Sequence, residues 1–321
     1  MALPAYAATW ERIWYYSFRF FCGLVFLFLI APVLLIIPLS FNAEPYFTFA
    51  DGMLPFKGLG PEWATWLPSP DAYSIRWYRD IFVNGMVNPQ ETDTWKWLAD
   101  SWANAQWMHS AKNSFIIAFF ATILSAALGT MAALGLSQSQ MPARNLIMSL
   151  LISPMIVPII ITAAGLFFFF SDVGLTSANG TLTGYLGIIF AHTVLGTPFV
   201  VITVTATLVG FDRSLIRAGE SLGAAPTTVF RKIVMPLILP GVISGALFAF
   251  ITSFDEVVAV IFLADYEQRT IPRQMWSGIR EQISPTILAV ATILVLISIA
   301  LLSTVELLRR RSERLRGLTP N

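Results

Sequence analysis

Charged residues are absent from six long stretches of the chain, and this spacing is the strongest pattern in the sequence. The uncharged stretches are 20–43, 113–143, 145–171, 173–211, 233–254 and 282–305. Each holds the roughly 20 apolar residues that a helix needs to cross about 30 Å of hydrocarbon. A chain inside lipid must satisfy its own backbone hydrogen bonds, and no barrel-like alternation is visible, so we interpret the stretches as helices. We expect six membrane-spanning helices at 18–41, 112–136, 146–170, 184–209, 238–262 and 285–307.

Composition agrees with an all-α integral membrane protein. Of the 321 residues, 56% are hydrophobic and only 12% are charged, and the mean hydropathy is +0.69. A soluble chain of this size carries far more charge on its surface. The net charge of +1 gives no reason to expect a nucleic-acid partner. The single cysteine, Cys22, has no disulfide partner, and two histidines are too few to suggest a zinc cluster.

The distribution of Lys and Arg predicts the orientation of the spans, because cytoplasmic segments carry an excess of both. With both termini in the cytoplasm, the short cytoplasmic segments hold most of the clustered basic residues: Arg12, Arg19, Arg144, Arg213, Arg217, Arg231, Lys232 and 309–316. Acidic residues instead gather in the first external loop. We therefore expect a cytoplasmic N-terminus at 1–17, a first span at 18–41, a long periplasmic loop at 42–111, a membrane core at 112–308 and a basic cytoplasmic tail at 309–321.

The long external loop is rich in tryptophan, with Trp63, Trp66, Trp77, Trp95, Trp97, Trp102 and Trp107. Amphipathic aromatic side chains suit the membrane interface, and they also suit a surface that binds another protein. The interface is the simpler interpretation for most of them.

The only sizeable cytoplasmic loop between spans has a distinctive sequence. Residues 211–240 read FDRSLIRAGESLGAAPTTVFRKIVMPLILP. Asp212 or Ser214 can cap a short helix that runs through Ser221, and Gly223 suits its C-terminal turn. Pro226 fits the first turn of a second short helix, 227–234, which we expect Pro236 to end. The expected pair of helices would offer a partner an apolar surface made of Leu215, Ala218, Leu222, Phe230 and Ile233. The alternative is an amphipathic loop that lies on the bilayer.

This loop resembles the coupling loop of binding-protein-dependent ABC transporter permeases. The family pattern is Glu-Ala-Ala, three residues, Gly, nine residues, then Ile-x-Leu-Pro. In this chain the matching positions are Arg217, Ala218, Gly219, Gly223, Ile233, Met235 and Pro236. Arg217 stands where the family has an acid and Met235 where it has Leu, while Glu220 lies one turn further on and could supply the acid. The resemblance implies that these residues, with Glu220, couple the chain to an ATPase.

The resemblance covers roughly residues 17–41 and 73–308, and it is closest to the polyamine branch of these importers. Segments similar to that branch include YSIRWYRDIF at 73–82, AHTVLGTPFVV from 191 and SFDEVVAVIFL from 253. Residues 43–72 and about 84–105 look like insertions. The resemblance implies spermidine or putrescine as the solute, while other amines, amino-acid derivatives and opine-like compounds remain open.

Family membership would imply a six-helix type I importer bundle in the inner membrane of a bacterium. It would also imply two ABC ATPase subunits, a second, homologous permease subunit and a periplasmic solute-binding protein. No GxxxxGK[ST] phosphate loop occurs in the sequence, so ATP-Mg is expected on the partner ATPase and no cofactor on this chain. We expect a transport subunit in contact with membrane lipid, and no enzyme.

Asp255 and Glu256 are adjacent carboxylates expected inside the fifth span, 238–262. A charge at the bilayer centre costs about 2.5–3.5 kcal/mol on the gentlest scale, so it normally faces water, a partner or a pore. Neighbours in a helix point about 100° apart. They could attract a cationic solute, with Asp255 facing the pore, or they could form polar bonds that hold helices together or gate the outer mouth.

Two prolines and a histidine mark other candidate positions in the spans. Pro154 and Pro158 flank an expected break in the third span, where freed carbonyls could face a cavity, although such prolines also simply kink helices. We expect His192 to be a hydrogen-bonded packing residue.

Two other classes of function lack their signals in the sequence. A stand-alone secondary carrier would show internal repeats, which are not visible, and an intramembrane enzyme would need a nucleophile–base pair or a metal motif such as HExxH, which is absent.

Overall fold

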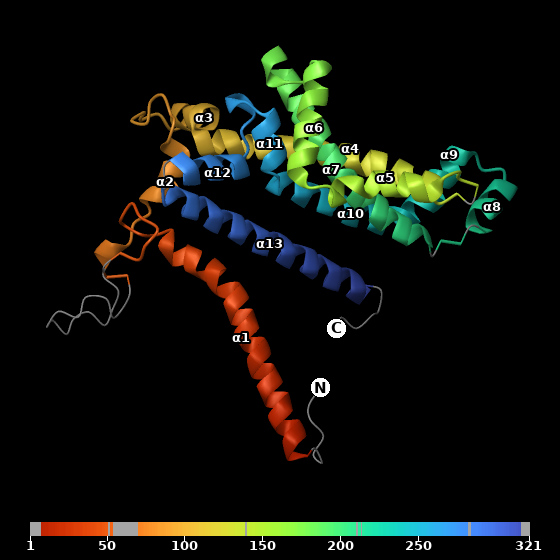
Figure 1. Cartoon of the computed structure of the whole chain (residues 1–321), viewed down its shortest axis with the longest axis horizontal. Helices are drawn as coiled ribbons and strands as arrows, with labels where there is room; N and C mark the ends of the chain where they lie inside the picture. The colour runs from red at the N-terminus through yellow and green to blue at the C-terminus, as the bar shows by residue number, and fades with distance from the viewer. Residues whose placement is uncertain are drawn as a thin grey trace. The chain divides into compact units, whose positions relative to one another are not determined.

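A computed structural model describes residues 8–50, 52–53, 70–138, 140–209, 211–212, 214–281 and 284–315. Most of these residues lie in helices (Figure 1). Within these ranges, β-structure is limited to an isolated bridge between Asn42 and Tyr73. The chain divides into two compact units. The first contains residues 1–84 and 278–321, and the second contains residues 85–277.

The described residues contain five helical stretches that are long and apolar enough to cross a membrane. These are Thr9–Leu39, Gln106–Leu136, Ile159–Asn179, Thr181–Val209 and Pro226–Asp255. Two shorter apolar helices, Arg144–Ile156 and Thr286–Ala300, lie where the third expected span begins and where the sixth is expected. An all-α membrane fold is therefore confirmed, with boundaries that differ from the expected ones.

The first unit is built from α1 (Thr9–Leu39), η1 (Pro70–Ala72), α2 (Arg76–Val83) and α13 (Thr286–Leu315). α1 begins before the expected residue 18, because the Glu11 carboxylate accepts the backbone N–H of Ala8 at 3.0 Å and so caps the helix there. α13 contacts both α1 and α2. A hydrogen bond of 2.7 Å from the Thr286 hydroxyl to Asp80 fixes the start of α13 on α2.

The second unit contains the other helices. They are α3 (Thr94–Asn104), α4 (Gln106–Leu136), α5 (Arg144–Ile156), α6 (Ile159–Asp172), η2 (Ser177–Asn179), α7 (Thr181–Val209), α8 (Ser214–Ser221), α9 (Pro226–Val229), the π-helical turn η3 (Phe230–Val234), α10 (Met235–Asp255), α11 (Val258–Leu263), η4 (Tyr266–Gln268) and the first part of α12 (Ile271–Glu281), whose last residues belong to the first unit.

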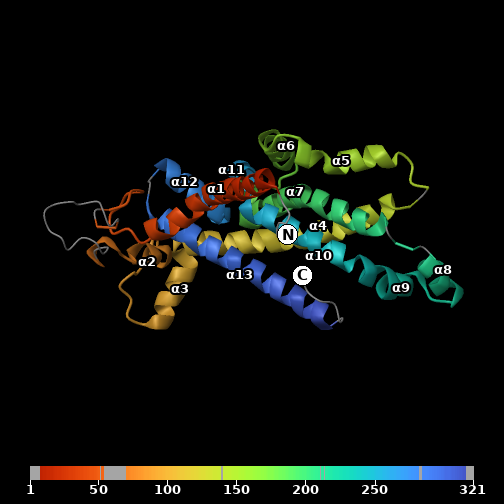
Figure 2. The same ribbon diagram turned by 90° about the horizontal axis from the view of Figure 1, so that it is seen from below.

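Helices α4, α7 and α10 lie side by side and form the centre of this unit (Figures 1 and 2). Small residues allow their close approach, because a Cβ at Gly129 would lie 2.6 Å from the Cβ of Val200, and one at Gly245 would lie 2.7 Å from the Cα of Val200. The predicted small-residue face of Gly241 and Gly245 is confirmed, since both are buried against α7. A Cβ at Gly135, by contrast, would meet open space.

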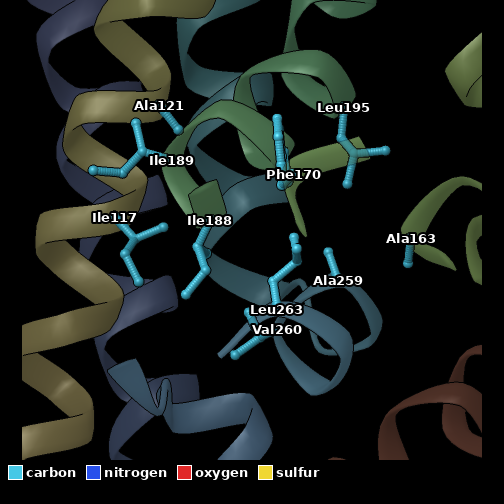
Figure 3. Packing of buried hydrophobic residues seen from close by; sticks show 11 residues of the cluster. Ile117, Ala121, Ala163, Phe170, Ile188, Ile189, Leu195, Ala259, Val260 and Leu263 are labelled. Atoms are coloured by element: carbon cyan, nitrogen blue, oxygen red, sulfur yellow. The ribbon is translucent and has the colours of Figure 1, made fainter. Parts of the chain in front are cut away.

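A hydrophobic cluster joins this centre to the shorter helices α6 and α11 (Figure 3). Ile117 comes from α4, Ile188 from α7, Phe170 from α6 and Val260 from α11, and all four are buried. This packing stabilises α6 and α11, because isolated helices shorter than about 12–15 residues are only marginally stable.

Two of the expected spans are interrupted, which corrects the sequence prediction. The expected helix 146–170 is α5 and α6, separated by Val157 and Pro158. The expected helix 238–262 is α10 and α11, separated by Glu256 and Val257. Pro158 explains the first interruption, since it lacks the N–H that would continue the helix. The second has no proline, and a side chain described below explains it.

Candidate functional site

Residues 211–236 link α7 to α10 and include the first two residues of α10. They form a bent helical segment that we call the elbow. Its first helix, α8, runs from Ser214 to Ser221 and so ends at the expected residue. The Asp212 carboxylate accepts the Ser214 backbone N–H at 2.8 Å and the Ser214 hydroxyl at 2.7 Å. These bonds, the hydroxyl first, stabilise the ionised form and hold the pKa of Asp212 below its ordinary value. The predicted cap is therefore confirmed, while Arg213 lies outside the described residues.

The C-terminal end of α8 is closed by a Schellman motif around Gly223. The backbone N–H of Gly223 donates to the carbonyl of Glu220 at 2.9 Å, and that of Ala224 donates to the carbonyl of Gly219 at 3.1 Å. Gly223 has a φ of +80°, in the region that residues with a Cβ rarely adopt. The predicted glycine turn is confirmed, and it sets the direction in which the chain leaves α8.

The second half of the elbow differs from the prediction. Pro226 is at the first turn of α9, as expected. The helix does not end at Pro236, because it passes through the π-helical turn Phe230–Val234 and continues as α10 to Asp255. In a regular helix the proline ring would clash with the carbonyl four residues earlier, and the wider turn removes that conflict. The elbow is therefore continuous with a membrane-spanning helix.

The two halves of the elbow pack directly on each other. Gly219 of α8 is buried, and a Cβ there would lie 2.9 Å from Cδ1 of Ile233 and 3.3 Å from Cγ2 of Val229. Val229 and Val234 belong to a buried cluster that also contains Val204 of α7 and Ile238 of α10. Because this cluster includes residues of both spans, a force on α8 reaches them through packed side chains.

One face of α8 is exposed and apolar. Leu215 and Ala218 of α8 and Leu222, the residue that follows it, lie at helical spacing and all are exposed, Leu222 to 88%. Phe230 and Ile233 were expected on the same surface, but they pack instead against the cluster beneath it. The family-motif residues divide in the same way: Gly219, Ile233 and Met235 are buried or partly buried, whereas Arg217, Ala218, Glu220, Gly223 and Pro236 are exposed.

A second feature lies at the other end of α10, where the helix is interrupted. One carboxylate oxygen of Glu256 accepts the backbone N–H groups of Val258 at 2.6 Å and Ala259 at 3.0 Å. Glu256 is 8% exposed, while Asp255 is exposed. The side chain thus caps α11 and explains the interruption. The expected geometry of two neighbours 100° apart on one helix is wrong, because the helix ends between them.

The remaining candidate positions within the spans are His192, Pro154 and Pro158. His192 Nδ1 lies 2.7 Å from the Ser253 hydroxyl and the ring is buried, so the expectation of a hydrogen-bonded packing residue is confirmed. Pro158 caps α6 at the interruption of the third expected span, whereas Pro154 lies within α5. Pro158 is exposed and Pro154 is partly buried.

The sequence alone did not single out a polar network that ties the 265–270 loop to α4 and α7. The Asn113 amide donates to the carbonyls of Glu267 at 2.8 Å and Arg269 at 3.0 Å, and it accepts the Tyr185 hydroxyl at 2.6 Å. An asparagine at the end of a span is a weak signal, because its partners are more than 70 residues away. In the parts of the chain that are described, no group of three or more His, Cys, Asp or Glu could hold a metal.

Comparisons with known proteins give a consistent result. A family model described as "Binding-protein-dependent transport system inner membrane component" matches residues 125–314. The spermidine/putrescine transport system permease protein PotC of Haemophilus influenzae is 27% identical over 293 residues, which cover 91% of this chain and 96% of PotC. The putrescine transport system permease protein PotI of Escherichia coli K12 is 29% identical over 274 residues, covering 84% of this chain and 82% of PotI.

A solved structure shares the fold. It is the crystal structure of a bacterial ABC transporter involved in the import of the acidic polysaccharide alginate. The TM-score is 0.62 with 16% sequence identity, and the match covers 96% of this chain and 99% of that one. At this identity the likeness shows the fold alone.

Proposed function

This chain belongs to the family of binding-protein-dependent transport system inner membrane components, and from that premise we propose that it forms half of the pathway by which a small cationic amine enters the cell. As a family member it is the permease component of an ABC importer. It is not an enzyme, and ATP hydrolysis resides on a separate chain. Its partners therefore include an ATPase and a solute-binding protein.

The composition of the complete transporter is part of the proposal. Two ATPase subunits carrying ATP-Mg, a second homologous permease subunit and one periplasmic binding protein would form the working assembly. The basic residues of the elbow and the C-terminal tail support an orientation with both termini in the cytoplasm, since cytoplasmic segments are enriched in Lys and Arg. The exposed α8 face would then lie on the side where ATP is hydrolysed.

One observation carries the mechanism: the helix that begins in the elbow runs without interruption from Pro226 to Asp255. This helix has 30 residues and so is about 45 Å long at 1.5 Å per residue. An ATPase that moves α8 also moves α9, because Gly219 packs against Ile233 and Val229. Movement of the elbow would therefore tilt the whole helix 226–255, which ends at the break between α10 and α11. That tilt would open the pathway to one side of the membrane and then to the other.

The exposed Asp255 is the proposed pathway residue for a cation. It lies at the end of the helix 226–255, where the following backbone turns away. Glu256 has a different role, since its carboxylate is committed to capping α11. The names of PotC and PotI support spermidine or putrescine as the solute. Other amines, amino-acid derivatives and opine-like compounds are the alternatives.

Reconstitution tests the proposal. The chain, its companion permease, the ATPase and the binding protein are placed in liposomes, and uptake of labelled putrescine and spermidine is measured with and without ATP. We expect uptake only with ATP and all subunits, and we expect the ATPase to co-purify with the chain. Uptake by this chain alone would identify it as a stand-alone secondary carrier. ATP-driven uptake of a different solute would retain the importer and reject the polyamine.

A further inference from the structure

Helix α3 (Thr94–Asn104) stands at the start of the span α4 and has no role in the proposed transport cycle. Asp93 caps it by accepting the backbone N–H groups of Trp95 at 2.9 Å and Lys96 at 3.3 Å. A single residue, Ala105, separates α3 from α4, and its extended backbone turns the chain between them. α3 runs across the direction of α4 in Figure 2. A helix across the end of a span lies parallel to the membrane surface.

The polar face of α3 is already occupied by the protein. The Asp100 carboxylate accepts the backbone N–H groups of Val87 at 3.2 Å and Asn88 at 2.8 Å, and the amide of Asn104 at 2.7 Å. These bonds hold the preceding loop against this face of the helix. They also hold the pKa of Asp100 below its ordinary value, the bond from Asn88 first, so the carboxylate is ionised at neutral pH.

The opposite face is apolar and exposed. Trp95, Leu98 and Trp102 are spaced at i, i+3 and i+7, which aligns them on one side of a helix. Their exposed fractions are 81%, 46% and 55%. Asp100 lies about 140° around the helix from Trp95 at 100° per residue. The stripe of Trp95, Leu98 and Trp102 therefore points away from the loop that covers the polar face.

We propose that α3 is a membrane-interface helix whose stripe inserts among the lipid headgroups beside the end of α4. The depth of α4 supports a lipid partner. Its 31 residues span about 46 Å at 1.5 Å per residue, which matches the roughly 40–45 Å of a bilayer with its headgroups. The first residue of α4 therefore lies at the outer edge of the headgroup layer, and α3 ends just before it, with Ala105 as the one residue between the two helices. Side chains reach roughly 5–6 Å from a helix axis, so they can enter that layer.

The residue types agree with lipid. Tryptophan is enriched where a membrane meets water, because its ring has an apolar body and a polar N–H. Lys96 is exposed and lies about 40° around the helix from Asp100 at 100° per residue. It is therefore on the polar side of α3, where an interfacial helix carries its basic residues. The inference requires only that α4 crosses the membrane, and it is independent of the solute and of the elbow.

Depth measurements on the assembled transporter in lipid nanodiscs test the inference. The chain has one cysteine, so Cys22→Ser gives a background for single labelling sites. A fluorophore is attached at Trp95→Cys, Leu98→Cys or Trp102→Cys, and quenching by nitroxide-labelled phosphatidylcholine is compared with quenching by iodide in water. Val87→Cys is the matched control, because Val87 is also 81% exposed but lies on the loop held at the polar face.

We expect the stripe positions to be quenched several-fold more by the lipid nitroxide than the Val87 control, and the control to be quenched more by iodide. Leu98→Cys retains both tryptophans, so this position stays informative if a tryptophan variant fails to fold. Equal quenching at stripe and control positions would overturn the inference. Protection of the stripe from both quenchers only after the binding protein is added would also overturn it, and would assign the stripe to a protein partner.

Discussion

Gly223 is the position at which the elbow is most sensitive to a single change. Its φ of +80° belongs to a conformation that costs a residue with a Cβ roughly 1–2 kcal/mol. No atom lies within 4 Å of a Cβ built at this position. A substitution therefore meets backbone strain without steric conflict, and the whole effect can be assigned to the bend.

A cost of roughly 1–2 kcal/mol corresponds to a factor of roughly 5–30 in an equilibrium. We expect Gly223→Val to lower, by this factor, the population of molecules whose elbow has the native bend relative to those whose elbow does not, because valine is β-branched and disfavours positive φ. The bend positions α8 on the helix that leads into the membrane. Uptake per ATP hydrolysed should therefore fall by up to the same factor, while membrane insertion stays normal.

The assay compares ATP hydrolysis with solute uptake in proteoliposomes that contain all the subunits. Gly223→Asn is the matched control, because asparagine adds a side chain but tolerates the left-handed conformation. We expect this variant to couple almost as well as the wild type. If Gly223→Val transports as much solute per ATP as Gly223→Asn, the bend does not transmit the motion and the proposed coupling is refuted.

Three further predictions concern packing, charge and pH. Gly245→Leu should separate α10 from α7 and lower the thermal unfolding midpoint in detergent, at a cost of about 1–3 kcal/mol for overpacking. The control Gly135→Ala should leave the midpoint unchanged or raise it. Equal midpoints for the two variants would contradict the close packing of α10 on α7. Asp255→Asn should reduce uptake of a cation with little loss of thermal stability. Glu256→Ala should lose a helix cap worth about 0.5–2 kcal/mol and lower the thermal midpoint. If Asp255→Asn lowered the midpoint and Glu256→Ala mainly reduced uptake, the two proposed roles would be wrong. The stabilisation from Asp100, whose pKa is lowered by its hydrogen bonds, is complete above the carboxyl's ordinary pKa and should disappear as pH falls through the lowered value. The measurement is the hydrogen-exchange protection of the amides at 87–88 relative to their intrinsic exchange rate at each pH. This protection should change with pH in the wild type and stay constant in an Asp100→Asn control; the same pH dependence in both would contradict the role of Asp100.

The elbow shows how far local sequence reasoning extends. Asp212 and Gly223 act on backbone groups within a few residues of themselves, so their roles as caps were predictable from the sequence. Ser214, the other candidate cap, instead donates its hydroxyl to Asp212. Pro236 was expected to end a helix, and this was wrong because a π-helical turn several residues earlier absorbs the conflict. Phe230 and Ile233 were expected on the surface, but they face a cluster that includes α7 and α10.

The sequence by itself determined that this is a helical membrane protein and which stretches are apolar, because the exclusion of charge from hydrocarbon acts on each segment separately. It also determined the spacing of the elbow. It did not determine that two of the expected spans are each divided into two helices. Only the tertiary structure decided that Glu256 ends α10 by capping α11, that Asn113 bonds with Tyr185 and the 265–270 loop, and that α3 leaves Trp95 and Trp102 exposed. Each of these features depends on which groups are in contact once the chain has folded, and no local pattern of apolar and polar residues specifies those contacts.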